Sequence, residues 1–329
     1  YLLCTRLANA GQVRGESRDR VVAVVGPDEA AALRADLTRH PERPASLARI
    51  LTPGEARPSL ERAEPLVEAV ASERSPVVVL DRWAAADDEI VAQAASLHEA
   101  GVRVRTLSLF YDEWLGKLPL SELERMSLMF DIGEVHRARY WRLKRLTDVL
   151  VAAVGAVGLA VALPFVIVGN LLGNRGPLFY RQQRVGRSGH PYDMLKLRTM
   201  RPDSGATQWT EHGDERITPF GRWLRVTHLD ELPQVLNVVK GDQAIVGPRP
   251  EQPRYVAELT DKIPFYSLRH LVKPGLTGWA QVKYDYGASE SDALEKLQYE
   301  FFYLRHQSLS MDLRIIGRTL RSVIGRSGR

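Results

Sequence analysis

An uncharged apolar run, Val149–Gly169, limits more than any other feature what this chain can fold into. Its 21 residues match the roughly 20 that a helix needs to cross the hydrocarbon core of a bilayer. Lys144, Arg145 and Asp148 flank its start, and basic residues are common at the cytoplasmic end of membrane helices. We therefore expect a membrane helix over residues 149–172, with a helix buried in the protein core as the alternative.

Two details of this run argue against a simple crossing. Pro164 lies inside the run and removes a backbone hydrogen bond, which bends a helix. The far flank is also basic, with Arg175, Arg181, Arg184 and Arg187, so both ends favour the cytoplasmic side. A re-entrant helix, which enters one leaflet and returns, satisfies both observations. An ordinary kinked transmembrane helix is the alternative.

The first third of the chain alternates between short apolar strands and helices. We expect strands at Val21–Gly26, Val77–Asp81 and Val102–Leu107, and helices at Asp28–His40, Pro58–Ser72 and Ala84–Ala100. This alternation predicts a small, parallel, Rossmann-like α/β module over residues 20–108.

The first turn of this module lacks the glycine pattern of a dinucleotide site. Gly26 stands where a phosphate loop would begin, but the second and third glycines are missing. Asp28 and Glu29 would also repel a pyrophosphate at the start of the helix. A structural or regulatory role is therefore preferred over dinucleotide binding.

These patterns divide the chain into four segments. Residues 1–19 are expected to be an N-terminal fragment, truncated because the chain starts at Tyr1 rather than at a methionine. The α/β module spans residues 20–108 and a linker spans residues 109–136. Residues 137–329 form a second domain that contains the membrane helix.

Charge and cysteine content limit the classes of partner. The chain has 45 lysines and arginines against 40 aspartates and glutamates, and this net charge of +5 suits a phosphate ligand or an anionic membrane surface. No nucleic-acid motif accompanies this small excess, so we expect no nucleic-acid partner. Cys4 is the single cysteine, which excludes an intrachain disulfide and zinc-finger spacing.

An acidic pair, Asp230 and Glu231, carries the clearest chemical signal. Pro233 fits the first turn of a helix that ends at Gly241, so the pair lies at a helix N-terminus, where the helix dipole stabilises ionised carboxylates. An ionised aspartate is a nucleophile towards phosphorus or a ligand for Mg²⁺. Adjacent acids in a first turn also serve as simple partners of the dipole, which is the alternative interpretation.

Cations accompany this pair in the sequence. Arg225 precedes Asp230 by five residues, and Arg249 follows in a turn rich in glycine and proline. Lys196 and Arg198 alternate, so on a strand they share one face. Phosphoryl transfer requires such cations, usually with Mg²⁺, around the transferring group. We therefore expect these four cations to bind phosphate or nucleotide.

Eight segments of the second domain occur in a characteristic order. They are Lys144–Asp148, Gly176–Gln182, Arg184–Gly186, Lys196–Met200, Leu229–Gln234, Asn237–Asp242, Val246–Pro250 and Pro274–Val282. This order resembles the bacterial sugar transferase family, the monotopic polyprenyl-phosphate glycosyl-1-phosphate transferases. The module ahead of it resembles the Rossmann-like domain of the longer members. The resemblance covers residues 144–324, and so many ordered matches argue strongly against chance agreement.

The resemblance implies a fold, a reaction and roles for individual residues. It implies an α+β catalytic domain embedded in the membrane through a re-entrant helix broken at Pro164, although Leu163 stands where some members have serine. Asp230 would be the nucleophile that attacks the β-phosphorus of a UDP-sugar and releases UMP, with Mg²⁺ bound near it. Glu231 would assist in acid/base work or in positioning. Undecaprenyl phosphate would then attack the phosphosugar-aspartate.

The same resemblance implies a location and partners. The catalytic domain would act at the cytoplasmic face of the bacterial inner membrane, in the first membrane step of polysaccharide or glycan synthesis. Glucose, galactose and an N-acetylated sugar are all open, and a homo-oligomer is compatible with the sequence. One rival is a non-catalytic membrane scaffold of the same fold. The other is a Rossmann enzyme that modifies nucleotide-sugars, but the α/β region lacks its glycine-rich loop and its Tyr-x-x-x-Lys pair.

Overall fold

The chain forms two compact units, residues 1–129 and residues 130–329. The computed structural model describes residues 18–39, 41–119, 138–201, 216–284 and 289–325. Residues 1–17 of the expected N-terminal fragment and residues 120–136 of the predicted linker lie outside these described residues.

A parallel four-stranded sheet forms the centre of the first unit, in the order β2-β1-β3-β4. Its strands are β1 (Asp19–Val24), β2 (Ala45–Leu51), β3 (Val77–Leu80) and β4 (Arg103–Thr106). The predicted α/β module is therefore confirmed. The sequence pattern did not reveal β2, because this edge strand contains Ser46 and Arg49 and buries only its two ends.

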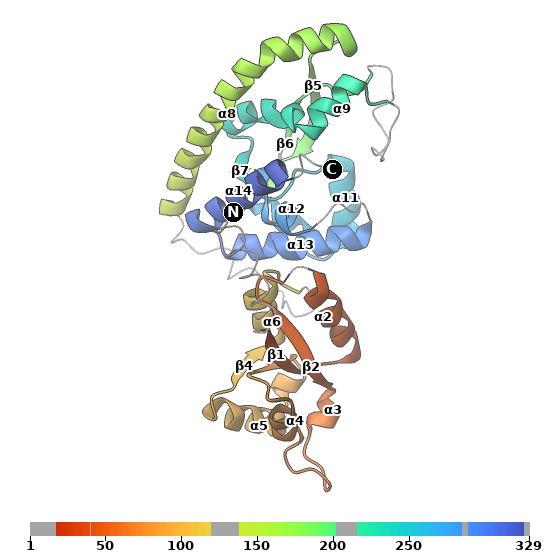
Figure 1. Ribbon diagram of the computed structural model, residues 1–329, viewed down its shortest axis with the longest axis vertical. Coiled ribbons are helices and arrows are strands. Elements are labelled where there is room, and N and C mark those ends of the chain that lie inside the picture. Colours follow the sequence, from red (N-terminus) through yellow and green to blue (C-terminus); the bar gives the residue numbers. More distant parts are fainter. Residues whose placement is uncertain (1–17, 40, 120–137, 202–215, 285–288, 326–329) are drawn as a thin grey trace, which may run out of the picture. The chain divides into compact units, whose positions relative to one another are not determined.

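Helices cover both faces of this sheet (Figure 1). They are α2 (Pro27–Arg39), α3 (Pro53–Ala56), α4 (Pro65–Glu73), α5 (Asp88–Glu99) and α6 (Leu107–Phe110), with a 3₁₀ turn, η1 (Ala84–Ala86). Because side chains alternate along a strand, Val21 packs with α2 and α6 on one face, whereas Val22 packs with α4 and α5 on the other. Strand β1 is therefore buried on both faces, as central parallel strands usually are.

The first unit extends further along the chain than the sequence predicts. Part of the expected linker continues from α6 as a π-helical segment, η2 (Tyr111–Leu115). Trp114 is fully buried in this segment, and its indole N–H donates to Asp19 Oδ2 at 3.0 Å. Lys117 is also buried and pairs with Asp36 at 2.8 Å. The linker prediction is wrong for this stretch, because its apolar residues are spaced among charged ones and did not mark a packed helix.

The second unit combines helices with two small sheets, an α+β arrangement. The antiparallel hairpin pairs β5 (Phe179–Val185) with β6 (Pro191–Leu197), and the parallel pair joins β7 (Ala244–Val246) to β8 (Gly275–Thr277). The α-helices are α8 (Ala138–Gly173), α9 (Pro219–Val226), α10 (Val235–Lys240), α11 (Pro253–Lys262), α12 (Trp279–Lys283), α13 (Glu290–Arg305) and α14 (Leu309–Gly325). The 3₁₀ segments are η5 (Arg187–Gly189), η6 (Leu229–Gln234) and η7 (Tyr266–Leu271).

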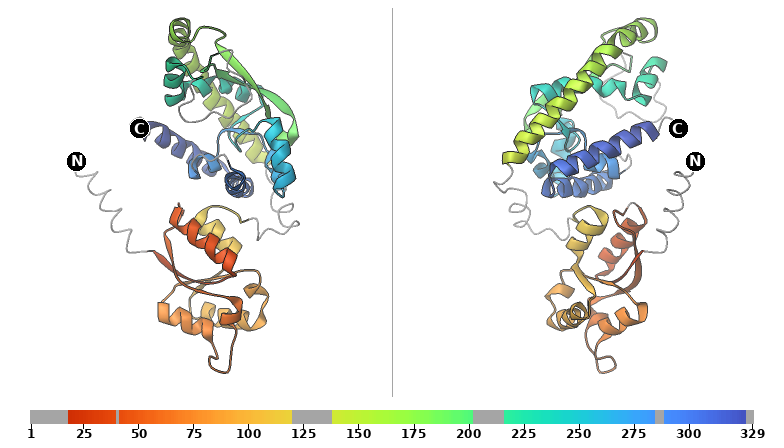
Figure 2. Two further views of the ribbon diagram at one scale, coloured as in Figure 1. Left: turned by 90° about the vertical axis from the view of Figure 1, so that its right-hand side faces the viewer. Right: turned by 60° about the vertical axis from the view of Figure 1, so that its left-hand side comes forward.

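Helix α8 is continuous over 36 residues and contains the predicted membrane run. By length and composition, its part Tyr140–Gly173 could span a bilayer, and no other helix among the described residues could. Large apolar side chains along it are exposed, among them Val154, Val157, Val161, Phe165 and Leu172. This exposure argues against the alternative of a buried core helix. Pro164 lies within α8, and the helix bends along the outside of its unit (Figure 1 and Figure 2, right).

The charged residues at the start of α8 hold the helix to the rest of its unit. Arg145 donates to two backbone carbonyls in the last turn of α10, at 2.6 and 2.7 Å. Lys144 is buried between Asp148, at 3.7 Å, and Asp312 of α14, at 3.0 Å. Asp148 also accepts a backbone N–H of β7 at 2.9 Å. These flank residues therefore dock α8 onto its own domain.

Candidate active site

The acidic pair lies in η6, immediately before α10. His228, just ahead of the pair, has a left-handed backbone with φ 56°, which few non-glycine residues adopt, and this bend starts the turn that carries Asp230 and Glu231. Pro233 lies inside η6, and Gly241 ends α10 with φ 98°. The pair therefore begins a 3₁₀ turn and not the predicted α-helix.

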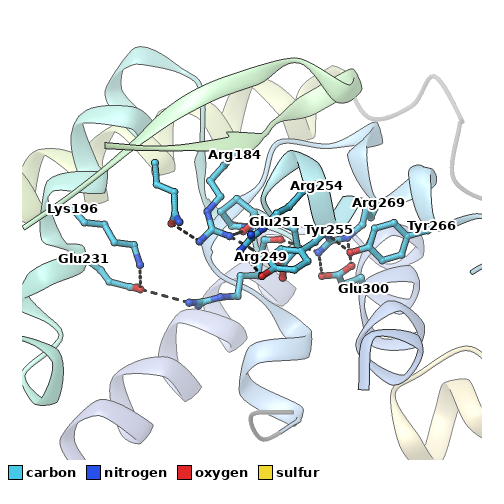
Figure 3. A network of polar contacts seen from close by, with 12 residues as sticks. Arg184, Lys196, Glu231, Arg249, Glu251, Arg254, Tyr255, Tyr266, Arg269 and Glu300 are labelled. Carbon is cyan, nitrogen blue, oxygen red and sulfur yellow. Dashed lines mark hydrogen bonds and ion pairs between the residues drawn. The ribbon is translucent and has the colours of Figure 1, made fainter. Parts of the chain in front are cut away.

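Two of the predicted cations hold Glu231 (Figure 3). Its Oε1 lies 2.9 Å from Nζ of Lys196 in β6 and 3.7 Å from Nη2 of Arg249, which follows β7. Burial opposes ionisation of Glu231, but the charges of Lys196 and Arg249 outweigh burial and lower the pKa of Glu231 to about 2. Glu231 is therefore a stable anion, and we call these three residues the Glu231 clamp.

Asp230 has different surroundings. Only 9% of the residue is exposed, and its carboxylate accepts no hydrogen bond from the residues that the structure describes. Burial, and then the negative charge of Glu231, raise the pKa of Asp230, while the charges of Lys196 and Arg225 act in the opposite direction. For Asp230, burial therefore acts against the ionisation that a helix dipole would favour. Its oxygens stay available to a ligand.

Arg225 approaches the pair from α9. Its Nε donates to Thr199 Oγ1 at 3.0 Å, which fixes the orientation of the guanidinium. Its charge acts on Asp230, as described for the pKa of that residue. The structure thus brings three of the four predicted cations, Lys196, Arg225 and Arg249, to the acidic pair.

Arg198 does not join this group. Its guanidinium is buried and donates to the side-chain oxygens of Asn170 and Asn174, near the end of α8, at 3.2 and 3.3 Å. It also donates to three backbone carbonyls, those of Pro177 at 2.6 Å, Met200 at 2.9 Å and Asn174. Strand β6 ends one residue before Arg198, so the alternation that would place it beside Lys196 does not apply. The structure therefore places Arg198 at the junction between the end of α8 and the end of β6.

A hollow opens beside the Glu231 clamp. The clamp and Arg184 all line it, so three cations and one anion face the same space. Such a space suits a diphosphate, whose charge the cations would neutralise. The sequence predicts no role for Arg184 in the site, yet this residue donates to the carbonyl of Pro250, 66 positions away, at 3.0 Å. No local pattern marks a contact over that distance.

Asp230 is the residue of this site that could contribute to a metal site. The described residues contain no group of three or more histidine, cysteine, aspartate or glutamate side chains that could hold a metal alone. Mg²⁺ commonly binds through one or two carboxylates and completes its coordination with water and substrate phosphates. The Asp230 carboxylate, which has no donor among the described residues, is suited to be one such ligand.

Known proteins match the unit that contains this site. The profile of the bacterial sugar transferase family matches residues 139–326. The chain is 36% identical over 187 residues to a UDP-N-acetylgalactosamine-undecaprenyl-phosphate N-acetylgalactosaminephosphotransferase from Aeromonas hydrophila. The matched stretch covers 56% of this chain and 44% of the relative. It is 39% identical over 219 residues to a UDP-glucose:undecaprenyl-phosphate glucose-1-phosphate transferase from Xanthomonas campestris pv. campestris. That match covers 65% of this chain and 44% of the relative. The chain therefore spans less than half the length of these two relatives.

Proposed function

Because the chain belongs to the bacterial sugar transferase family, we propose that it transfers a sugar-1-phosphate from a UDP-sugar to undecaprenyl phosphate, with release of UMP. The observation that carries this proposal is the contrast within the acidic pair. Glu231 holds Lys196 and Arg249 beside a hollow, while Asp230 presents a carboxylate without a donor among the described residues. The names of the relatives, which describe transfer to undecaprenyl phosphate, support the same class of reaction.

Asp230 is the nucleophile of the first step in this proposal. One of its carboxylate oxygens attacks the β-phosphorus of the UDP-sugar, the bond from that phosphorus to the bridging oxygen breaks, and UMP leaves. The product is a phosphosugar-aspartate. Because burial raises the pKa of Asp230, its anion is more basic, and therefore more nucleophilic, than a solvated carboxylate.

Undecaprenyl phosphate takes part in the second step. One of its phosphate oxygens attacks the phosphorus of the phosphosugar-aspartate and displaces the Asp230 carboxylate, which gives the undecaprenyl-diphosphate sugar. Lys196 and Arg249 stabilise the equatorial oxygens of the transferring group in both steps. Asp230 would be the residue that holds Mg²⁺, and the ion would supply additional neutralisation of charge when bound.

The role of Glu231 follows from its charge. A group with a pKa of about 2 carries no proton near neutral pH and is a poor general acid or base. We therefore assign Glu231 to positioning, because it fixes two cations at the place where the diphosphate must lie.

Helix α8 is the proposed membrane anchor, and we infer that it is re-entrant. Its start is bound to α10 through Arg145, and its end is bound to the residue after β6 through Asn170 and Asn174. Because both ends are bound to the same folded unit, they lie on the same side of a bilayer unless that unit is itself inside it. The exposed apolar residues between them then enter one leaflet, and the basic flanks favour the cytoplasmic face of the inner membrane.

Cysteine labelling tests this topology. Arg142 and Arg175 are exposed near the two ends of α8, and Cys4 is the single native cysteine. In a Cys4→Ser background, Arg142→Cys and Arg175→Cys should both react with an impermeant maleimide from the cytoplasmic side of inverted vesicles. Labelling from opposite sides would mean that α8 crosses the bilayer.

A UMP-release screen tests the proposed reaction. The protein in detergent, with Mg²⁺ and undecaprenyl phosphate, should release UMP with at least one UDP-sugar, and Asp230→Asn should not. A membrane scaffold of the same fold would release none. An enzyme that modifies nucleotide-sugars would change the UDP-sugar without lipid and without forming UMP.

A further inference from the structure

The turn that carries Arg249 is held at each carbonyl from Pro248 to Glu251. The first and last of these carbonyls accept the backbone N–H groups of Gly275 in β8 and Val185 in β5, at 2.8 and 2.9 Å. The second and third accept guanidinium N–H groups of Arg269 in η7 and Arg184 in β5, at 2.9 and 3.0 Å. Donors from three elements therefore leave the backbone of this turn little freedom.

The Arg249 side chain itself is less enclosed. It is 36% exposed and reaches Glu231 at 3.7 Å, across the open side of the hollow. The bonds to the turn fix the Cα atom from which this side chain extends towards Glu231. The second carbonyl of the turn, which belongs to Arg249 itself, is the point closest to that atom.

The donor to that carbonyl belongs to a buried ion pair (Figure 3). Arg269 and Glu300 of α13 are each about 4% exposed and form two bonds, Nε to Oε2 at 2.8 Å and Nη2 to Oε1 at 2.6 Å. Arg269 Nη1 also donates to the Tyr266 hydroxyl at 3.1 Å. These bonds fix the plane of the guanidinium, so its remaining Nη2 hydrogen points at the Arg249 carbonyl.

Stability alone is a weak reason for such a pair. Two buried charges gain little net stability compared with apolar side chains of the same size, because their desolvation costs about as much as their attraction returns. The planar guanidinium of an arginine fixes donors in two directions at once, whereas the three donors of a lysine rotate about a single nitrogen. One direction of the Arg269 guanidinium is used by Glu300. The other is used by the contact with the Arg249 carbonyl, which lies towards the site.

We propose that Arg269, oriented by Glu300, is a positioning residue that sets where the Arg249 guanidinium stands, and thereby the affinity of the site for the diphosphate of a nucleotide-sugar. This inference rests on the proposed function of Arg249 as a phosphate-binding cation. It adds two residues, 20 and 51 positions beyond Arg249, that bind no substrate themselves.

A double-mutant cycle tests the inference. Arg269→Lys keeps the positive charge but removes the planar guanidinium with its several N–H donors. Glu300→Gln keeps the shape of the side chain but removes its negative charge. Each should raise the KM for the UDP-sugar and the Kd for UDP by about 10-fold or more, since small displacements of a positioned group cost up to about 100-fold. In an Arg249→Ala background the same changes should cost less than about threefold, because residues that act through one group are not additive.

A merely structural role gives a different result. A smaller folded fraction would lower kcat and leave KM unchanged. Alternatively, KM and Kd would rise by the same factor with and without Arg249→Ala. Either outcome overturns the inference. Lys262→Gln, which breaks an exposed ion pair with Glu258 (2.9 Å), is the matched control and should change neither constant. If Arg269→Lys does not fold, Tyr266→Phe removes one bond of the network and should give a smaller shift of the same sign.

The two readouts separate this inference from the proposed reaction. If the wild-type protein binds UDP but releases no UMP with any UDP-sugar, the proposed reaction fails, and the cycle in UDP affinity still decides the role of Arg269. If the wild-type protein does not bind UDP, both the proposed function and the positioning role are wrong.

Discussion

Asp81 in the first unit and Asp230 in the second are both buried carboxylates, yet their surroundings are opposite. Asp81 follows β3 and uses both oxygens, because Oδ2 accepts the N–H of Gly26 at 2.8 Å and Oδ1 accepts the N–H of Ala84 at 2.7 Å. Asp230 accepts no hydrogen bond from the described residues and lies next to the Glu231 clamp. Both oxygens of Asp81 are therefore hydrogen-bonded within the first unit, whereas the oxygens of Asp230 are available to a ligand.

The position of Asp81 makes this comparison instructive. Gly26 and Asp81 follow β1 and β3, the central neighbours in the sheet, and ligands of doubly wound folds bind at such a place. Here the N–H of Gly26 is already used, and a Cβ on Gly26 would lie 2.7 Å from Glu29 Oε2. Carboxylates therefore occupy the edge where a phosphate would sit. The contrast teaches that two buried carboxylates of one chain differ most in hydrogen-bond saturation, which leaves the oxygens of Asp230 available to a ligand.

Asp230→Asn should have the largest effect on chemistry. It removes the nucleophilic charge, so UMP release should fall by at least about 10³-fold. Because no hydrogen bond from the described residues is lost, the free energy of unfolding should change by less than about 1 kcal/mol. UMP assays and thermal unfolding in detergent measure the two effects.

Trapping experiments sharpen the same prediction. Labelled UDP-sugar without lipid acceptor should leave label on the wild-type protein, and peptide mapping should place it on Asp230. Label on Glu231 would reverse the assignment of the two acids. Kinetics of a ternary complex without any trapped label would favour direct attack by the lipid phosphate.

Glu231→Gln should have the second largest effect. The change removes the anion that holds Lys196 and Arg249, so kcat/KM should fall by about 10²-fold. The nucleophile remains, and the covalent label should still form, only more slowly. Rapid-quench measurement of labelling checks this. Complete loss of label at unchanged UDP affinity would show that Glu231 takes part in the chemistry directly.

The sequence predicted the parts of the site that depend on local order. Asp230 and Glu231 are neighbours, so their common location followed from the motif itself. The sequence did not predict that they differ in charge state, because the cations that stabilise Glu231 come from β6 and from the turn after β7. Arg269 and Glu300 carry no motif, and their contact spans 31 positions.

The errors in the fold have a similar origin. The alternation of side chains along a strand placed Lys196 on the correct face of β6. It did not predict that β6 ends at Leu197, so the surroundings of Arg198 were predicted wrongly. Trp114 lies in a charged stretch, and only the packing of α6 and η2 against the sheet shows that it belongs to the core. Patterns within one element are readable from the sequence, whereas contacts between elements require the fold.

Lys196 and Arg198 allow a third, smaller test. Lys196→Ala should raise the KM for the UDP-sugar about 10-fold with little loss of stability, because this side chain is part of the clamp and partly exposed. Arg198→Ala should leave that KM within about twofold and lower the free energy of unfolding by about 3 kcal/mol, because it leaves buried oxygens without donors. Steady-state kinetics and urea unfolding separate the two. A large rise in KM for Arg198→Ala, with little loss of stability, would show that Arg198 does bind phosphate.

Asp81→Ala should have the smallest effect on chemistry and tests the other side of the comparison. It leaves the N–H groups of Gly26 and Ala84 without their acceptor, which should destabilise the first unit by about 3 kcal/mol. Hydrogen exchange of peptides from β1 and β3 should accelerate accordingly, while UMP release changes by less than about twofold. Asp28→Ala, which removes an exposed acid from the first turn of α2, is the matched control and should change neither. If Asp81→Ala instead lowers UMP release 10-fold with both units folded, the edge of the sheet takes part in the reaction. Saturation of a carboxylate by backbone donors would then no longer distinguish a structural acid from a functional one.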